Sequence, residues 1–184
     1  MKKLVIAFFV LCGSFGFSLQ GQNITTDSIS SLAWMIGKWD TSATLEASDG
    51  NSTKEAGFRE CSWVLGNRVI RCDGYLRNQD TTYSNGTAYR SVITYIAYNK
   101  AKDHYKVTWI RSNGNHTTVT FEKKNDSVLY SAFTYTPPSL GFDMRINSTI
   151  SRIDGDHITE LELLENEDKS FTERFELRAT RVAK

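Results

Sequence analysis

Trp34-Met35-Ile36-Gly37-Lys38-Trp39 joins two regions of different periodicity, and the fold follows from this junction. Before it, Thr26 or Asp27 can cap a short helix over residues 28–35, whose apolar residues recur at helical spacing (Ile29, Leu32, Ala33 and Ile36). After it, apolar and polar residues alternate with period two almost to the C-terminus. The sequence therefore predicts one short helix followed by an all-β domain, in which Gly37 allows a close turn and Trp39 covers one end.

The alternating region divides into about ten expected strands separated by turn residues such as Asp49-Gly50-Asn51 and Asn113-Gly114-Asn115. Links this short join antiparallel neighbours, and an open sheet of this size would leave two exposed edges, so we expect an up-and-down antiparallel barrel. A sandwich would need longer crossing connections, for which only residues 79–88 and 135–141 are long enough. The expected strands are residues 39–47, 55–65, 68–78, 89–98, 104–112, 116–122, 127–134, 142–153, 157–165 and 170–181.

Alternation also predicts which side chains face the barrel interior. One inward set is Tyr105, Val107 and Trp109 with Thr117, Val119 and Phe121; the others are Cys61, Trp63, Leu65, Ile70 and Cys72, and Phe171, Phe175, Leu177 and Ala179. A barrel of this size has room for side chains and one small ligand. We therefore take Tyr95, Trp109 and Phe121 as candidate ligand contacts, although packing alone also explains inward aromatic residues.

The N-terminus predicts export. Met1-Lys2-Lys3 and the apolar run 4–11 have the form of a secretory signal peptide, which we assign to residues 1–22, leaving residues 23–184 as a single domain. A lipid anchor at Cys12 is disfavoured because the preceding residue, Leu11, is large. We expect a periplasmic or secreted protein without a transmembrane segment.

Cys61 and Cys72 are the cysteines that remain after signal removal. If Gly66-Asn67 is the two-residue loop of a hairpin, Leu65 pairs with Arg68, and Cys61 then lies directly opposite Cys72. Directly opposed residues are close enough for a disulfide, and exported proteins meet oxidising conditions. Two reduced core thiols or a metal pair are the alternatives.

Charged residues suggest one way to orient a ligand. Glu173 alternates in phase with Phe171 and Phe175, so it can point inward, and Arg145 or Arg71 could supply its cation from another strand. Such a pair would hold an acid or an amide, and we name Glu173 and Arg145 as candidate ligand-binding residues. Solvated charges at a strand end are the alternative interpretation, which also applies to Glu160, Glu162 and Glu176.

Other functions have little support in the sequence. A formal net charge of +1 gives no electrostatic attraction to nucleic acid. His104, His116 and His157 lack metal-ligand spacing, so we expect no metal and no cofactor. No nucleophile motif or phosphate-binding loop is present in the sequence, so we expect no enzyme.

Three motifs in the same order resemble the domain-of-unknown-function-1579 family: residues 32–39, the segment Glu60-Cys61-Ser62-Trp63 continuing to Arg68, and residues 96–110. The resemblance implies an exported bacterial protein with a calycin-like barrel, similar to lipocalins and fatty-acid-binding proteins, and it transfers no catalytic residues. We therefore expect an exported, non-enzymatic binding protein that holds a small, mostly apolar ligand in its barrel. The alternatives are a filled barrel that acts through its surface and a haem-binding barrel similar to the nitrobindins.

Overall fold

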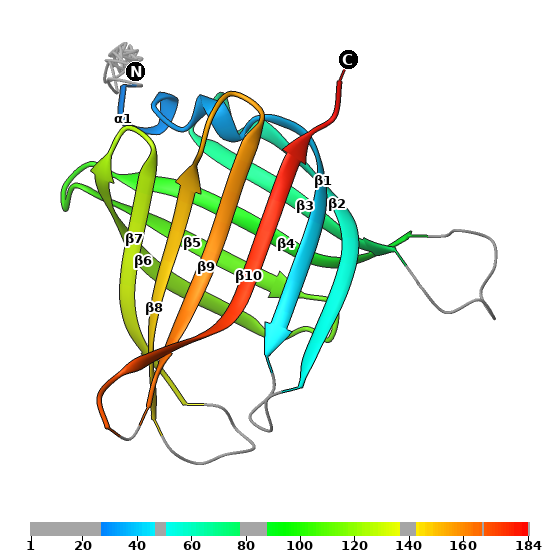
Figure 1. Ribbon diagram of the computed structural model, residues 1–184. Coiled ribbons are helices and arrows are strands. Elements are labelled where there is room, and N and C mark those ends of the chain that lie inside the picture. The colour runs from blue at the N-terminus through cyan, green and yellow to red at the C-terminus, as the bar shows by residue number, and fades with distance from the viewer. Residues whose placement is uncertain (1–26, 47–50, 78–87, 137–142, 167, 184) are drawn as a thin grey trace, which may run out of the picture.

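The computed structural model describes residues 27–46, 51–77, 88–136, 143–166 and 168–183 (Figure 1). The predicted signal peptide and Cys12 lie outside these residues. The described chain begins with α1 (Asp27–Ser30) and one 3-10 turn, η1 (Ala33–Met35), and continues as strands. These are β1 (Gly37–Glu46), β2 (Ser52–Val64), β3 (Val69–Arg77), β4 (Ala88–Asn99), β5 (His104–Arg111), β6 (His116–Asn125), β7 (Val128–Tyr135), β8 (Met144–Arg152), β9 (His157–Glu165) and β10 (Phe171–Arg181).

The strands form one closed antiparallel barrel in which each pairs with its neighbours in sequence and β1 also pairs with β10. This confirms the predicted up-and-down barrel. Figure 1 shows α1 and η1 across one end, which we call the helix-covered end; the opposite end is the far end. Strands β1, β3, β5, β7 and β9 run towards the far end, and the strands between them run back, as antiparallel pairing requires.

The core fills the helix-covered half of the barrel. Trp39, Tyr105 and Phe121 are almost completely buried there. The predicted inward sets on β5 and β6 are confirmed, because Tyr105, Val107, Val119 and Phe121 are buried and share one face of the paired strands with Trp109 and Thr117. Other buried members of this core are Leu32, Met35, Cys61, Ile70, Cys72, Ile96, Leu129, Ile150, Ile158 and Ala179.

The helical segment is shorter than predicted. A single α-turn and a 3-10 turn replace the continuous helix expected over residues 28–35, and the residue before the 3-10 turn, Leu32, has φ −95° and ψ 11°. Its buried residues, Ile29, Leu32 and Met35, are therefore three apart, and Ala33, expected on the same face, is exposed. The spacing of three suits a 3-10 turn that lies flat over the barrel end.

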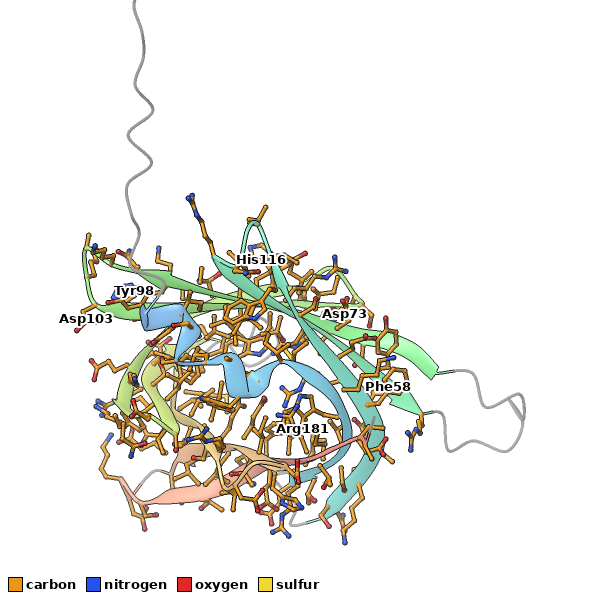
Figure 2. The ribbon with its side chains drawn as sticks, turned by 90° about the horizontal axis from the view of Figure 1, so that it is seen from above. Phe58, Asp73, Tyr98, Asp103, His116 and Arg181 are labelled. Carbon is orange, nitrogen blue, oxygen red and sulfur yellow. A yellow bond between two sulfur atoms is a disulfide. The ribbon has the colours of Figure 1, made fainter. Side chains whose placement is uncertain are left out.

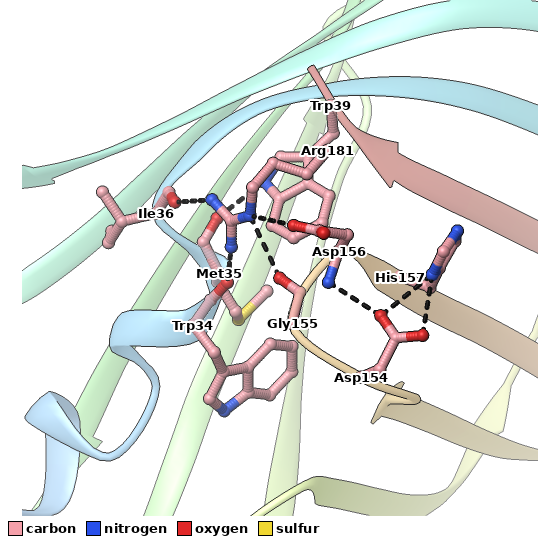
Figure 3. Close-up of polar contacts among 9 residues, drawn as sticks. All are labelled: Trp34, Met35, Ile36, Trp39, Asp154, Gly155, Asp156, His157 and Arg181. Carbon is pink, nitrogen blue, oxygen red and sulfur yellow. Dashed lines mark hydrogen bonds and ion pairs between the residues drawn. The ribbon is translucent and has the colours of Figure 1, made fainter. Parts of the chain in front are cut away.

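Arg181, the last residue of β10, fastens this segment to the barrel (Figure 3). Its guanidinium donates hydrogen bonds to the carbonyl oxygens of Trp34 and Ile36, both at 2.9 Å, and its Nε donates to that of Gly155 at 3.1 Å. The same group lies over the Trp39 ring, 4.1 Å from its centroid. The motif that starts the barrel and the residue that ends it therefore form one structural unit.

Gly37 is required beside Arg181. Its φ of +134° is a conformation that L side chains rarely adopt, and a Cβ there would lie 2.7 Å from Nη1 of Arg181. Trp39 donates its indole N–H to the carbonyl of Met35 at 2.9 Å. The predicted roles of Gly37 in the close turn and of Trp39 in covering the barrel end both match this geometry.

The β2–β3 hairpin has the predicted register, and Cys61 and Cys72 are opposite each other and joined by a disulfide. The turn differs from the prediction, because the strands end at Val64 and Val69 and leave four residues between them. Leu65 has φ +51° and is 76% exposed, so its predicted inward position is wrong. It belongs to the turn, where strand alternation no longer applies.

Candidate functional site

In strand β9, Glu160 and Glu162 face the barrel interior, whereas Leu161 and Leu163 face outward. Glu160 pairs with Ile150 and Glu162 with Ser148, and both of these β8 partners are buried on the inward face. Leu161 instead pairs with Glu176 of β10, on the outward register. Because burying carboxylates in a barrel is unfavourable unless they have partners, this strand indicates a functional site rather than ordinary core.

Glu160 has a cationic partner inside the barrel. Arg59 of β2 is at the inward position between Gly57 and Cys61, and its Nη1 donates a hydrogen bond to Oε1 of Glu160. The side chains of Arg59 and Glu160 are 9% and 15% exposed. In the sheet β1 and β10 lie between β2 and β9, so the pair links two strands that are not neighbours. It forms a charged pair inside the barrel, which we call the Arg59–Glu160 centre.

Part of the Arg59 guanidinium has no hydrogen-bond partner among the described residues. Nε and Nη2 are both buried and have no hydrogen-bond acceptor among the described residues, whereas Nη1 donates to Glu160. Nε–H and one N–H of Nη2 point along the same edge of the guanidinium, in the fork that matches two acceptor oxygens. A buried cation with an unused pair of donors costs free energy unless something binds it.

Glu162 adds a second carboxyl to this interior. Burial raises the pKa of the Glu162 carboxyl above its ordinary value of 4.5; the neighbouring Glu160 raises it further, whereas Arg111 opposes both effects. Arg111 shares the inward register of β5 with Trp109 but lies at the exposed far end, where it donates to Thr117 at 3.3 Å. The site therefore combines a fixed cation with a carboxyl that takes up a proton easily.

Several buried inward positions of the barrel carry small side chains. These are Ala43, Thr94, Ser131, Ser148 and Ala179. Towards the far end, inward residues become partly accessible: Leu45 is 40% exposed and Tyr135 is 37% exposed. Burial thus decreases along the barrel axis, and solvent reaches inward side chains from the far end.

Two of the sequence-predicted site residues lie inside the barrel. Trp109 and Phe121 are on the inward faces of β5 and β6, and their rings meet edge to face with centroids 6.0 Å apart. Phe121 is fully buried, whereas Trp109 is half-buried and lies nearer the far end. Trp109 is therefore the better placed of the two to contact a ligand.

Tyr95 faces the outside of the barrel, so its expected inward position is wrong. It pairs with Arg71 and Thr108, whereas its neighbours Thr94 and Ile96 are buried on the inward face. On the same outer surface Arg71 binds Asp73 at 2.9 Å. Figure 2, looking down on the helix-covered end, places Asp73 and Phe58 on the outer side of the strands and Arg181 beneath the helical segment.

Arg145 and Glu173 do not form the predicted inward pair. Arg145 is on the outer face of β8, 68% exposed, and binds Glu165 at 3.4 Å beside a surface pocket of ≈ 240 Å³. Glu173 pairs with Leu163, and a bulge separates it from Phe175, which pairs with Glu162. The extra residue, Arg174, removes the expected alternation between Glu173 and Phe175; the Glu173 side chain itself lies outside the described residues.

The histidines remain apart from the Arg59–Glu160 centre. His157 contacts the carboxylate of Asp154 through Nδ1 at 2.8 and 2.9 Å in the β8–β9 turn, as Figure 3 shows. His104 and His116 begin β5 and β6, which start at opposite ends of the barrel. Within the described ranges no three His, Cys, Asp or Glu side chains are grouped so as to hold a metal ion.

Replacing Glu162 with glutamine is expected to change how stability depends on pH. Because the folded-state pKa of Glu162 is raised, the stability that this carboxyl contributes is fully present below its unfolded pKa and is lost as pH rises through the folded pKa. The melting temperature of Glu162→Gln relative to wild type should therefore increase with pH across that window and then level off. Thermal melts of both proteins from about pH 4 to about pH 8 measure it. A constant difference at every pH would contradict the assignment.

The closed antiparallel barrel with its short helical cover has a calycin-like fold. The family described as "Protein of unknown function (DUF1579)" matches residues 26–181, and the chain belongs to that family. None of the curated proteins compared with the chain matches it. None of the helices in the described part of the chain has the length and apolar composition to cross a bilayer.

Two solved structures share the fold. Rv2717c from M. tuberculosis is 11% identical with a TM-score of 0.61, over 85% of this chain and 98% of that one. The S-type phycobiliprotein lyase CPES from Guillardia theta is 8% identical with a TM-score of 0.57, over 85% of this chain and 94% of that one. At these identities the likeness is one of fold.

Proposed function

We propose that this protein is an exported, non-enzymatic binding protein that holds a small, mostly apolar ligand inside its barrel. The observation that carries the proposal is the free, buried donor edge of Arg59. Core arginines are normally satisfied, because leaving buried N–H groups without acceptors is unfavourable. A ligand that supplies the acceptors would remove that cost.

The side chains that line the barrel indicate that most of the ligand is apolar. Between the Arg59–Glu160 centre and the far end, the half-buried inward side chains include Trp109, Phe133, Ile146 and Leu164. Binding sites for small molecules commonly combine such an apolar wall with a few convergent polar groups. Entry from the far end agrees with the partial exposure of Leu45 and Tyr135, since the helical segment covers the other end.

Binding rather than catalysis is proposed because the polar groups hold each other in place. Arg59 is fixed by Glu160, and the inward aromatic residues Trp109 and Phe121 offer contact area rather than reactive atoms. The disulfide between Cys61 and Cys72 agrees with export, because such bonds persist in oxidising compartments. The predicted signal peptide would direct the protein into the export pathway.

Native mass spectrometry of the protein purified from its own host tests the proposal. A single recurring mass increment is expected, which disappears after denaturing extraction and refolding. The matched control is the variant Arg145→Met, which changes an exposed arginine on the outer face and should keep the increment. Spectra of the host-purified protein without any bound small molecule would favour the alternative, a barrel filled by its own side chains.

A further inference from the structure

The chemical class of the ligand can be inferred from the geometry of Arg59. We propose that the ligand is an amphipathic monocarboxylic acid, whose carboxylate accepts two hydrogen bonds from Nε and Nη2 of Arg59. This inference rests on the proposed function, since it names the ligand of the same site. It starts from two facts: these nitrogens are buried without a partner, and the Arg59 side chain is only 9% exposed.

The pair of donors favours a carboxylate over other polar groups. Two N–H groups along one edge of a guanidinium match the two coplanar oxygens of a carboxylate, which form short, charge-assisted hydrogen bonds. An alcohol offers a single acceptor oxygen. An amide also offers one, and its NH2 group would face the second N–H donor. Each of these would leave part of the buried edge unsatisfied.

The charges nearby favour a monoanion. Glu160 already uses Nη1 of Arg59, and Glu162 follows two residues later on the same inward face. A doubly charged phosphate would therefore be held beside two carboxyl groups and would be repelled by any that is ionised. A carboxylate brings one charge, and the easily protonated Glu162 reduces the repulsion it meets.

Glu160 also orients the guanidinium before a ligand arrives. Because Nη1 is hydrogen-bonded to Glu160, the Nε–Nη2 edge is held in one direction, and binding needs little further ordering of the side chain. The apolar body of the acid would extend from this edge past Trp109 towards the far end. Glu160 is thus a positioning residue for Arg59.

Isothermal titration calorimetry with three probes of equal chain length tests the proposal: decanoic acid, decanamide and decan-1-ol, each below its aggregation threshold. The wild-type protein should bind decanoic acid about 10- to 100-fold more tightly than the alcohol or the amide. Arg59→Lys keeps the charge but loses the fork, so most of this preference should disappear. The double variant Arg59→Met/Glu160→Met should lose the whole preference and retain its affinity for decan-1-ol.

Two further variants separate the cation at the centre from other arginines. Arg145→Met on the outer face should keep the preference for the acid. A preference that survives in Arg59→Lys but disappears in Arg111→Met would overturn the proposal, because it would place the carboxylate at the far end. Equal wild-type affinities for the three probes would also overturn it, while leaving the proposed binding function intact. If the protein bound none of the three probes, the monocarboxylic-acid proposal would also be overturned. The proposed binding function would be overturned only if mass spectra of the host-purified protein showed no bound small molecule.

Discussion

Replacing Arg59 with methionine while Glu160 stays in place is expected to lower the free energy of unfolding by about 3–5 kcal/mol. The Glu160 side chain is 15% exposed and receives a hydrogen bond from Arg59. Without that cation, its carboxylate would remain in the interior as an uncompensated charge beside the second carboxyl, Glu162. Urea denaturation followed by circular dichroism measures the loss.

The double variant Arg59→Met/Glu160→Met is the matched control for this prediction. Replacing a buried ion pair by apolar side chains of similar volume is often neutral or stabilising, so the double variant should recover most of the lost stability. Such recovery would mean that the pair is not there for stability, in agreement with a role in binding. A double variant as unstable as the single one, or a single variant close to wild type, would contradict this account.

Arg181→Ala is expected to destabilise the protein by about 2–4 kcal/mol, because hydrogen bonds from a charged group contribute more than neutral ones. The substitution removes the donors to the carbonyl oxygens of Trp34, Ile36 and Gly155, together with the contact over the Trp39 ring. The helical segment would lose its attachment to β10 and to the β8–β9 turn. For a domain of this size the loss corresponds to a melting temperature lower by about 5–15 °C.

Arg178→Ala provides the comparison on the same strand. Arg178 is on the outer face of β10, is 72% exposed and pairs with Glu176 at 2.8 Å. Exposed ion pairs contribute little, so its removal should cost less than about 1 kcal/mol. Equal effects of the two substitutions in thermal unfolding would show that Arg181 does not fasten the helical segment. Near-neutral behaviour of both would lead to the same conclusion.

The barrel could be predicted because its strands alternate and its links are short. Residues 104–122 are the clearest case: inward Tyr105 and Val107 face inward Phe121 and Val119 across the β5–β6 hairpin. The Cys61–Cys72 register followed from counting outward from the turn. Local pattern and pairing agree in these segments, and such agreement is what makes a sequence specify a structure.

Tyr95 shows where the pattern was insufficient. Strand β4 carries apolar residues on both faces, with Val92 and Ile96 on one and Ile93 and Tyr95 on the other. Alternation alone could not choose between these faces, and only pairing with β3 settles the choice. Burial of Cys72 opposite Thr94 places the Thr94 face inside. The tyrosine is consequently outside.

The expected phase between Glu173 and Phe175 differs from the strand register for another reason. The bulge between Glu173 and Phe175 inserts one residue and reverses the alternation, and no glycine or proline marks it in the sequence. In β9 the apolar pattern also pointed the wrong way, since Leu161 and Leu163 alternate with the glutamates and would normally be the inward set. Glu160 and Glu162 occupy that face instead.

Arg59 was missed although a signal for it was present. It alternates in phase with Cys61 and Trp63, which the sequence placed inside, so the same rule already placed an arginine in the interior. A cation on a predicted inward face should have been matched with carboxylates on other strands. The barrel does contain an inward ion pair, but its members come from β2 and β9. These strands are not neighbours in the sheet, so the pairing of consecutive strands does not predict their contact.

A crystal structure of the protein with bromine-labelled decanoic acid would show whether the barrel holds a ligand at Arg59. An anomalous peak for the bromine is expected inside the barrel, on the far-end side of Trp109. The carboxylate is expected within hydrogen-bond distance of Nε and Nη2 of Arg59, while Glu160 keeps Nη1. A bromine peak on the outer surface, or an interior filled by side chains with Arg59 bound only to Glu160, would contradict the account.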